Sequence, residues 1–201
     1  MASALDPEVR TRRWRRSEYE RLIELGMFIG ERLELLDGHL VVGEPQHSPH
    51  MATVMQAATV LTTAFGEGWH ARVQGPLALD DESEPEPDVA VVPGVPLDYF
   101  DAHPATAPLV LEVADASLRL DRRFKAGLYA RAGLPEYWIV NLVDRVVEVH
   151  RDPQPAPDAE YGVAYASIEL LRPPATIAPL AMSSVRIAVA DLLPRSGTPA
   201  R

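Results

Sequence analysis

Apolar side chains recur with a helical period in three parts of the chain. Ser17 and Glu20 have the spacing of a capping box, which predicts a helix start at Ser17. Ser48-Pro49 places a proline in the first turn of the clearest helical pattern, which should end before Gly66. The predicted helices run from Ser17 to near Gly26, from Ser48 to about Phe65, and from about Leu120 to Ala132.

Shorter apolar runs predict strands between and after these helices. Asp37-Gly38 is a strong signal for a two-residue hairpin turn, and a second hairpin should turn near Val143-Asp144. The predicted strands cover residues 32–36, 40–42, 69–79, 88–92, 109–113, 136–142 and 145–150, with two or three weaker strands to about residue 189. The predicted loops are an acidic one over 80–87, one over 93–107 and a proline-rich one over 152–160.

This order of elements predicts an α/β fold of the mixed α+β kind, with a central mixed β-sheet flanked by helices. It lacks the strict alternation of a doubly wound fold. We expect a basic flexible arm over residues 1–16, a single domain over 17–193 and a tail over 194–201. The arginines of the arm could contact phosphates, but a solvated tail is the favoured interpretation.

Composition narrows the class of protein. The chain has 201 residues, 47% hydrophobic and 24% charged, and it contains no cysteine. Disulfides, thiolate metal sites and cysteine nucleophiles are therefore excluded, and a reducing cytoplasm is the expected location. We expect neither a signal peptide nor a membrane span. The net charge of −10 argues against a passive nucleic-acid coat protein, although not against a metal-dependent enzyme acting on nucleic acid.

Lys125 is the only lysine among 19 basic residues; all the others are arginine. An amine is a compact charge that burial and neighbours can tune, whereas a guanidinium always stays charged. A single lysine in such a chain therefore suggests a role that needs an amine. The alternative is an exposed helix lysine paired with Asp121, four residues earlier.

Two carboxylates stand on apolar strands just before this lysine. Asp88 begins one strand and Glu112 lies near the end of the next, and a buried carboxylate is costly unless it is paired, hydrated or bound to a cation. Carboxylate oxygens and water suit Mg²⁺, and the chemistry that uses two carboxylates, a hard cation and an amine together is phosphodiester hydrolysis. The alternative is structural: Asp88 caps a turn and Glu112 pairs with an arginine.

At these residues the chain resembles the PD-(D/E)XK nuclease superfamily, and more narrowly its Uma family of restriction-endonuclease-like proteins. The matching segments are Glu34-Leu35-Leu36-Asp37-Gly38, Ser48-Pro49-His50, Glu86 to Val92 with its Pro87-Asp88 pair, Leu109 to Val113, and Asp121 to Val140 with Lys125, Tyr129, Gly133 and Pro135 to Trp138. Together they span about residues 17–150.

The resemblance implies a restriction-endonuclease-like fold and a set of site residues. Asp88 and Glu112 would bind the divalent metal, with the main-chain carbonyl of Val113 as a further ligand. The superfamily lysine usually stands two residues after the acidic residue, where this chain has Ala114. In the family that the chain resembles, the amine moves to the following helix, which implies Lys125.

Four further residues are candidates of lower rank. Glu34 could correspond to the superfamily's additional N-terminal acidic residue or could face solvent, and the two interpretations are equally favoured. Asp121 and Tyr129 lie one turn on either side of Lys125, so they could share its face. His50 could approach the site, but a simple position at the helix start is favoured. Tyr137 and Trp138 are expected to pack in the core.

The leading hypothesis is a Mg²⁺-dependent endonuclease that hydrolyses DNA, with Mn²⁺ as a possible substitute and no membrane partner. A homodimer is plausible, although no sequence feature specifies an interface. The alternative is a catalytically silent nuclease-fold protein that acts as a binding or assembly module, which the acidic net charge favours. A carboxylate-pair hydrolase acting on sugars ranks lowest, because it leaves Lys125 without a role.

Overall fold

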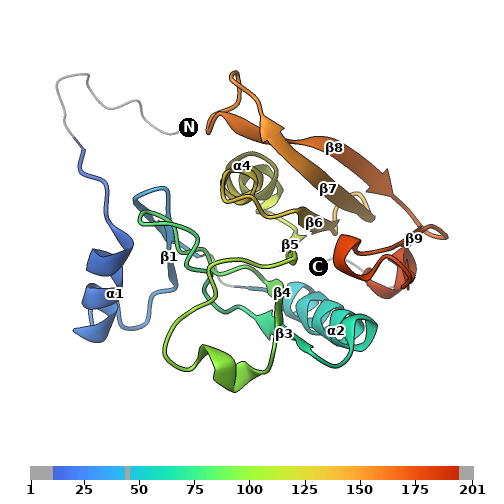
Figure 1. Ribbon diagram of the computed structural model, residues 1–201, viewed down its shortest axis with the longest axis horizontal. Helices are drawn as coiled ribbons and strands as arrows, with labels where there is room; N and C mark the ends of the chain where they lie inside the picture. Colours follow the sequence, from blue (N-terminus) through green and yellow to red (C-terminus); the bar gives the residue numbers. More distant parts are fainter. Residues whose placement is uncertain (1–10, 44–45, 195–201) are drawn as a thin grey trace.

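The computed structural model describes residues 11–43 and 46–194 (Figure 1). Its elements, in chain order, are α1 (Arg16–Glu24), β1 (Leu33–Leu36), β2 (His39–Val42), α2 (Ser48–Phe65), β3 (Trp69–Val73), β4 (Val89–Pro93), η1 (Pro96–Tyr99), β5 (Leu109–Ala114), α3 (Leu118–Leu120), η2 (Asp121–Lys125), α4 (Ala126–Arg131), β6 (Glu136–Asn141), β7 (Val146–Pro155), β8 (Val163–Leu171), β9 (Thr176–Ile177), η3 (Leu180–Met182), β10 (Ile187–Ala188) and η4 (Val189–Asp191). None of the described helices has the length and apolarity that a membrane crossing needs.

A six-stranded mixed sheet in the order β3-β4-β5-β6-β7-β8 forms the centre of the fold, which confirms the predicted class. Only β5 and β6 pair in parallel, and the helical segment from α3 to α4 connects them. Parallel neighbours need such a crossover, whereas the other strand pairs are antiparallel.

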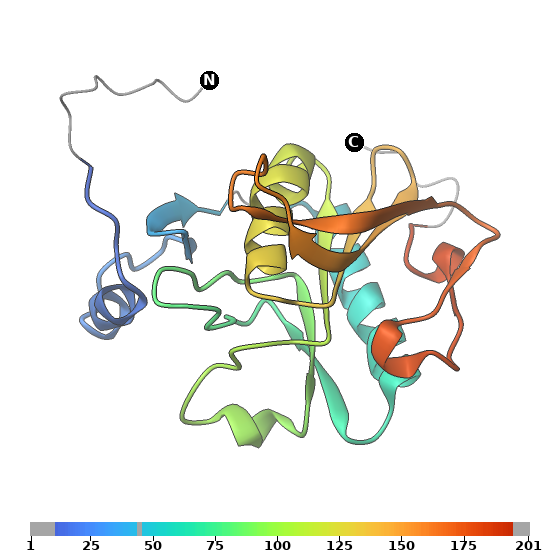
Figure 2. The same ribbon diagram turned by 45° about the horizontal axis from the view of Figure 1, so that its top comes forward.

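Helices cover both faces of this sheet (Figures 1 and 2). The apolar side of α2 packs on the face that contains Leu111 and Val113, together with the C-terminal segment. The opposite face, with Val110 and Ala114, packs against α4. Tyr137 and Trp138 are fully buried, as predicted, one in each of these two cores.

The hairpin β1–β2 lies beside the sheet rather than in it (Figure 1). Asp37 and Gly38 have φ values of 49° and 74°, which suit the tight turn that their sequence predicted. The main-chain N–H of Glu84 donates to the carbonyl of Leu35 at 2.7 Å, so the acidic loop before β4 holds the hairpin in place. This docking brings β1 to the edge of the central fold.

The N-terminal residues that the structure describes lie against the turn of this hairpin and against the acidic loop. The Arg13 guanidinium pairs with Asp37, the Trp14 N–H donates to the Gly38 carbonyl at 2.9 Å, and the Arg16 N–H donates to the Asp81 carbonyl at 2.6 Å. Residues 1–10 of the expected arm and residues 195–201 of the expected tail lie outside the described residues.

The helix between β5 and β6 contains one wide turn. The Ala126 N–H donates to the carbonyl of Asp121, five residues earlier, so η2 is a π-helical turn between α3 and α4. Such turns are rare and often accompany functional sites. The sequence predicted this helix but not the change in its winding.

Three boundary predictions were wrong. The strand from Trp69 ends at Val73 instead of Leu79, because Gln74 adopts a positive φ of 50° and turns the chain. β7 continues to Pro155, into the predicted loop 152–160, because it pairs with β8 along its length. Helix α1 begins at Arg16, before the predicted start at Ser17, because the Glu18 carboxylate accepts the Arg15 N–H at 3.1 Å.

Candidate active site

Asp88 lies immediately before β4, opposite the end of β5. Its Oδ2 accepts the main-chain N–H of Val113 at 2.9 Å, and its Oδ1 lies 3.3 Å from the amide nitrogen of Gln74 and 3.4 Å from that of Gln46. The Nε2 atom of His50, in the first turn of α2, lies 3.2 Å from the same Oδ2. Both oxygens of this carboxylate therefore have protein partners.

Glu112 projects from β5 toward the helix between β5 and β6. Strand alternation places it on the face of Val110 and Ala114, as predicted. Its Oε1 accepts hydrogen bonds from the Lys125 amine at 2.9 Å and from the Tyr129 hydroxyl at 2.8 Å. Its Oε2 accepts the main-chain N–H of Asp88 at 3.2 Å, which joins the two strand ends directly.

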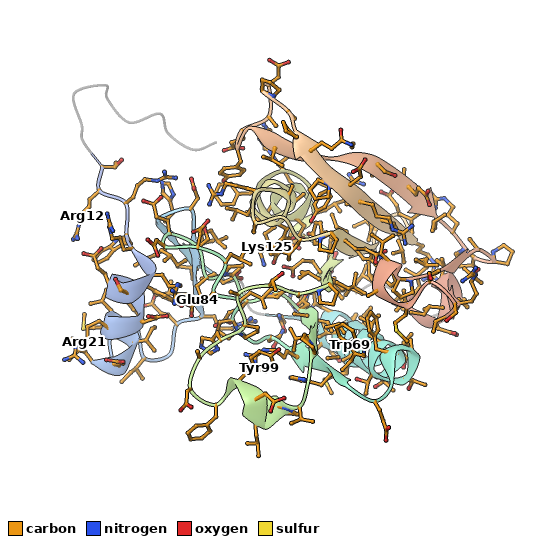
Figure 3. The ribbon with its side chains drawn as sticks, in the orientation of Figure 1. Arg12, Arg21, Trp69, Glu84, Tyr99 and Lys125 are labelled. Carbon is orange, nitrogen blue, oxygen red and sulfur yellow. The ribbon has the colours of Figure 1, made fainter. Side chains whose placement is uncertain are left out.

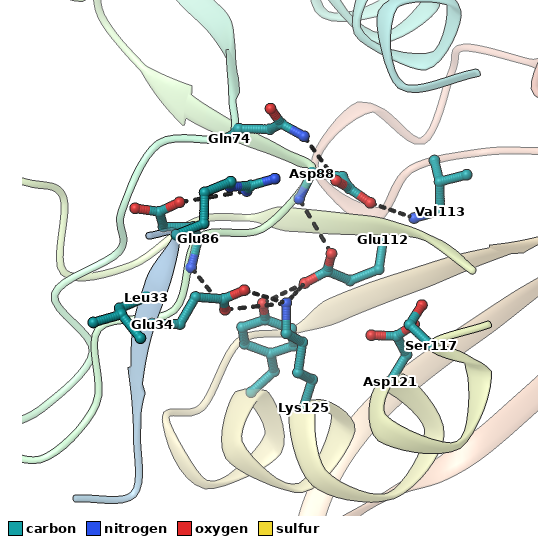
Figure 4. Close-up of polar contacts among 12 residues, drawn as sticks. Leu33, Glu34, Gln74, Glu86, Asp88, Glu112, Val113, Ser117, Asp121 and Lys125 are labelled. Atoms are coloured by element: carbon teal, nitrogen blue, oxygen red, sulfur yellow. Dashed lines mark hydrogen bonds and ion pairs between the residues drawn. The ribbon is translucent and has the colours of Figure 1, made fainter. Parts of the chain in front are cut away.

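The amine of Lys125 lies between two carboxylates from different elements (Figure 4). Its Nζ is 2.9 Å from Oε1 of Glu112 and 3.1 Å from Oε2 of Glu34 on β1. The same Oε2 atom of Glu34 also accepts the main-chain N–H of Glu86 at 3.1 Å, which fixes the position of the Glu34 carboxylate. Figure 3 shows Lys125 in the middle of the molecule, between the N-terminal segment and the sheet.

Asp121 lies one turn before Lys125 and is also buried. Its Oδ2 accepts the hydroxyl of Ser117 at 2.6 Å. Asp121 and Lys125 line the same cavity, and Lys125 and Tyr129 both contact Glu112, so these three residues share one face of the helix, as the spacing suggested. Asp121 adds a further carboxylate to the wall of the site.

A cavity of about 250 Å³ opens onto these residues. One wall is the hairpin β1–β2 and the other is the segment from the end of β5 into the helix. The charged and polar side chains that line the cavity include Arg32, Glu34, Gln46, His47, His50, Glu86, Asp88, Glu112, Asp115, Ser117, Asp121 and Lys125.

Burial and excess negative charge control the protonation of this cluster. Burial raises the pKa of the Glu112 carboxyl to about 8, against the opposing effect of the Lys125 amine. Burial also raises the pKa of Asp121, to about 6, again against Lys125. Burial lowers the pKa of the Lys125 amine, but the carboxylates of Glu112, Glu34 and Asp121 outweigh burial and hold it above its usual value. The cluster thus favours the uptake of positive charge.

For Asp88 and His50, hydrogen bonds and opposite charges outweigh the effect of burial on the pKa. Burial would raise the pKa of Asp88, but the hydrogen bond and charge of His50, the Val113 N–H and Lys125 together hold it below its usual value. Burial lowers the pKa of His50, but Asp88 and the Val113 main chain outweigh it and raise this pKa. Asp88 is therefore an anion at neutral pH.

The site offers two carboxylates, Asp88 and Glu112, as ligands for a hard divalent cation. Asp88 and Glu112 meet at adjacent strand ends and belong to a cluster of buried carboxylates that one amine neutralises only in part. Within residues 11–43 and 46–194, no three histidine, aspartate or glutamate side chains form a ready metal-binding group. Such a cation would therefore also need main-chain oxygen and water, which Mg²⁺ commonly retains.

The structure brings together all the residues that the sequence singled out for the site. Asp88, Glu112 and Lys125 converge on one cavity, and Glu34, which is half-buried, lines the same cavity. Lys125 is buried rather than exposed, and its contacts are to Glu112 and Glu34. Their roles in metal binding and catalysis stay predictions.

Sequence reasoning missed part of the surroundings of Asp88. His50 is at the helix start, as favoured, but its ring also reaches the site. Gln46 and Gln74 were not singled out at all, and they contact each other at 2.7 Å while both approach Asp88. Among these three residues, only His50 had a signal in the sequence, namely its place in the Ser48-Pro49-His50 segment. The two glutamines had no signal, because their contacts depend on the tertiary fold.

Comparisons with known proteins give the chain its family. The comparison with curated proteins finds no match. Among solved structures, a crystal structure from Anabaena variabilis, described as a putative nuclease belonging to DUF820, is similar at a TM-score of 0.62. It is 14% identical, and the match covers 80% of this chain and 88% of that chain, which shows a shared fold. Residues 16–190 match the family model Uma2, described as "putative restriction endonuclease", and the chain therefore belongs to the Uma2 family.

Proposed function

We propose that this protein is a Mg²⁺-dependent endonuclease that hydrolyses phosphodiester bonds of DNA, with Mn²⁺ able to replace Mg²⁺. The observation that carries the proposal is the buried Lys125 amine, placed against Glu112 and in the same cavity as Asp88. Membership of a family described as restriction endonucleases supports DNA as the substrate.

The proposed metal ligands are the carboxylates of Asp88 and Glu112 and the main-chain carbonyl of Val113. A Lewis acid that polarises a phosphoryl oxygen and activates water is what a bound Mg²⁺ supplies at such a site. The Val113 N–H and His50 orient Asp88, while Tyr129 and Lys125 fix one oxygen of Glu112. Both carboxylates are therefore held in place before any ligand arrives.

Lys125 has the geometry to stabilise charge on the substrate. An ammonium group has three N–H donors, and Glu112 and Glu34 accept two of them. The third can donate to a phosphate oxygen or to the attacking water in the cavity that Lys125 lines. Glu34 holds the amine in this position, so we assign it a supporting role in catalysis.

Incubation with DNA and a divalent cation tests this proposal. The protein should cleave double-stranded plasmid or single-stranded circular DNA with Mg²⁺ or Mn²⁺, and chelation should stop the reaction. Asp88→Asn and Lys125→Ala should each lower the rate by at least about 100-fold, the usual scale for the loss of one electrostatic group. A wild-type protein that cuts neither DNA faster than Lys125→Ala would refute the proposal.

A second candidate is a catalytically silent binding or assembly module. The observation that favours it is the set of protein donors around Asp88, which contact both of its oxygens. Metal titration separates the two candidates. A functional metal site gains thermal stability with Mn²⁺ and loses most of that gain in Asp88→Asn, whereas a silent module shows no metal-dependent shift.

A further inference from the structure

The depth of the site limits the form of DNA that can reach it. The side chains of Asp88, Glu112, Lys125 and Glu34 are 7%, 5%, 6% and 13% exposed. A stiff duplex keeps its paired bases stacked in a rod. Enzymes that modify a base inside an enclosed pocket take single strands or extrude the nucleotide from the duplex, and a phosphate that must reach this depth meets a similar barrier.

The walls of the cavity suit one unpaired strand. Val41, Val42 and Gly43 of the hairpin line one side, and Ala116 and Leu120 line the other. Val42 is 59% exposed and Leu120 is 37% exposed, so both offer apolar surface to the face of an unpaired base. The cavity volume, about 250 Å³, lies just below the usual range of roughly 300–1,000 Å³ for pockets that enclose a small molecule.

The charges at the rim disfavour a duplex. Duplex DNA carries about one negative charge per 1.7 Å of its axis, and its binding is driven by many phosphate contacts. The lining includes the carboxylates of Glu86 and Asp115, and the Arg32 guanidinium lies 3.4 Å from Glu86. A single strand needs fewer phosphate contacts and can bind through its bases as well.

We infer that the substrate class of this site is an unpaired DNA strand, which enters between the hairpin β1–β2 and the segment after β5. This inference rests on the proposed function for its chemistry, but its prediction about binding stands without cleavage. It specifies which part of a DNA molecule is cut: single strands, loops and bubbles, rather than intact duplex.

One labelled DNA strand, presented in three forms, tests the inference. The forms are the free strand, its fully paired duplex and a duplex with a central unpaired bubble. With Mn²⁺ the free strand should be cut at least about 30-fold faster than the duplex, since unpairing costs a few kcal/mol per extruded base. Cuts in the bubble substrate should map to the unpaired stretch. Equal rates on free strand and duplex, or cuts outside the bubble, would overturn the inference.

Binding separates a failure of this inference from a failure of the proposed chemistry. Fluorescence anisotropy of the wild-type protein in Ca²⁺ should show at least about tenfold tighter binding of the free strand than of the duplex. If no DNA is cut but this preference holds, the proposed chemistry fails and the inference stands. Equal affinity for both forms, or no binding of either, would refute the inference.

A wall variant locates the strand in the cavity. Val42→Asp places a carboxylate where the strand should pass, so binding of the free strand should weaken by about tenfold. Leu97→Asp is the matched control, because Leu97 is 78% exposed on η1 and does not line the cavity. Melting temperatures should stay close to wild type in both variants, and equal binding by both would argue against this path.

Discussion

At the scale of single residues, we expect that only an amine functions at position 125, because Nζ lies between two carboxylates. Lys125→Arg should therefore be as inactive as Lys125→Ala. A guanidinium carries the same charge, but its planar fork is larger and cannot occupy a point between Glu112 and Glu34. Cleavage of single-stranded circular DNA by the purified variants measures this, and an active Lys125→Arg protein would show that charge alone is sufficient.

His50 acts on the site through Asp88. Its Nε2 lies 3.2 Å from Oδ2 of Asp88, and its Nδ1 has no hydrogen-bond partner among the described residues. His50→Ala should weaken Mn²⁺ binding by about tenfold, because Asp88 loses one of the contacts that orient it. Titration followed by thermal melting measures this effect. His39→Ala, at an exposed residue of β2, is the control, and equal metal affinity in both variants would remove this role.

At the scale of elements, the acidic loop that holds the hairpin in place carries a buried titratable carboxyl, that of Glu84. Burial and the neighbouring Glu20 carboxyl raise the pKa of Glu84 to about 7, above the usual value of 4.5. The folded chain thus holds this proton more tightly than the unfolded chain. The bound proton stabilises the folded state fully below about pH 4.5, and this contribution is lost as the pH rises through 7.

Glu84→Gln should therefore stabilise the protein more at pH 8 than at pH 5. An amide stays neutral at both values, so the variant avoids the cost of a buried charge. Thermal unfolding of wild type and variant at the two pH values measures the difference, expected to be a few degrees at pH 8. Glu67→Gln, at an exposed position after α2, is the control. A gain that is the same at pH 5 and pH 8 would contradict the assignment to Glu84 ionisation.

The packing of α4 on the β7–β8 hairpin depends on the absence of a side chain at Gly127. A Cβ atom there would lie 2.6 Å from the Tyr161 ring. Gly127→Ala should lower the melting temperature, although alanine favours helices by about 1 kcal/mol over glycine. In a Tyr161→Ala background the same substitution should raise the melting temperature. Thermal melting of the four proteins tests the pair, and a decrease in both backgrounds would exclude this contact as the cause.

The sequence predicted those elements whose signals are local. Asp37-Gly38 has its own turn chemistry, and Ser48-Pro49 marks a helix start without help from the rest of the chain. The end of β3 at Gln74 could not be predicted, because a positive φ at a glutamine is imposed by tertiary contacts, including its contact with Asp88. The approach of His50 to Asp88 joins residues 38 positions apart, which no local pattern records.

At the scale of the whole molecule, acidic residues outnumber basic ones, 29 to 19, and part of the arginine charge is neutralised within the fold. The net charge is −10, and many arginines form ion pairs with carboxylates. The paired arginines are Arg12, Arg13, Arg16, Arg21, Arg32, Arg122, Arg131 and Arg151. The net charge therefore disfavours long-range attraction of DNA, and under the proposed function we expect affinity to come mainly from the cavity.

This charge distribution predicts that DNA binding depends only weakly on salt. If two or three phosphates of a single strand are neutralised, log K should fall with log[salt] with a slope of about −1.4 to −2.1. Anisotropy titrations of the free strand in Ca²⁺, over a range of NaCl concentrations, measure this slope. A basic-surface binder would give a steeper slope, near −5 or beyond, because it releases more counterions. Such a slope would mean that arginines outside the cavity supply a phosphate-binding surface and that the cavity is not the main source of affinity.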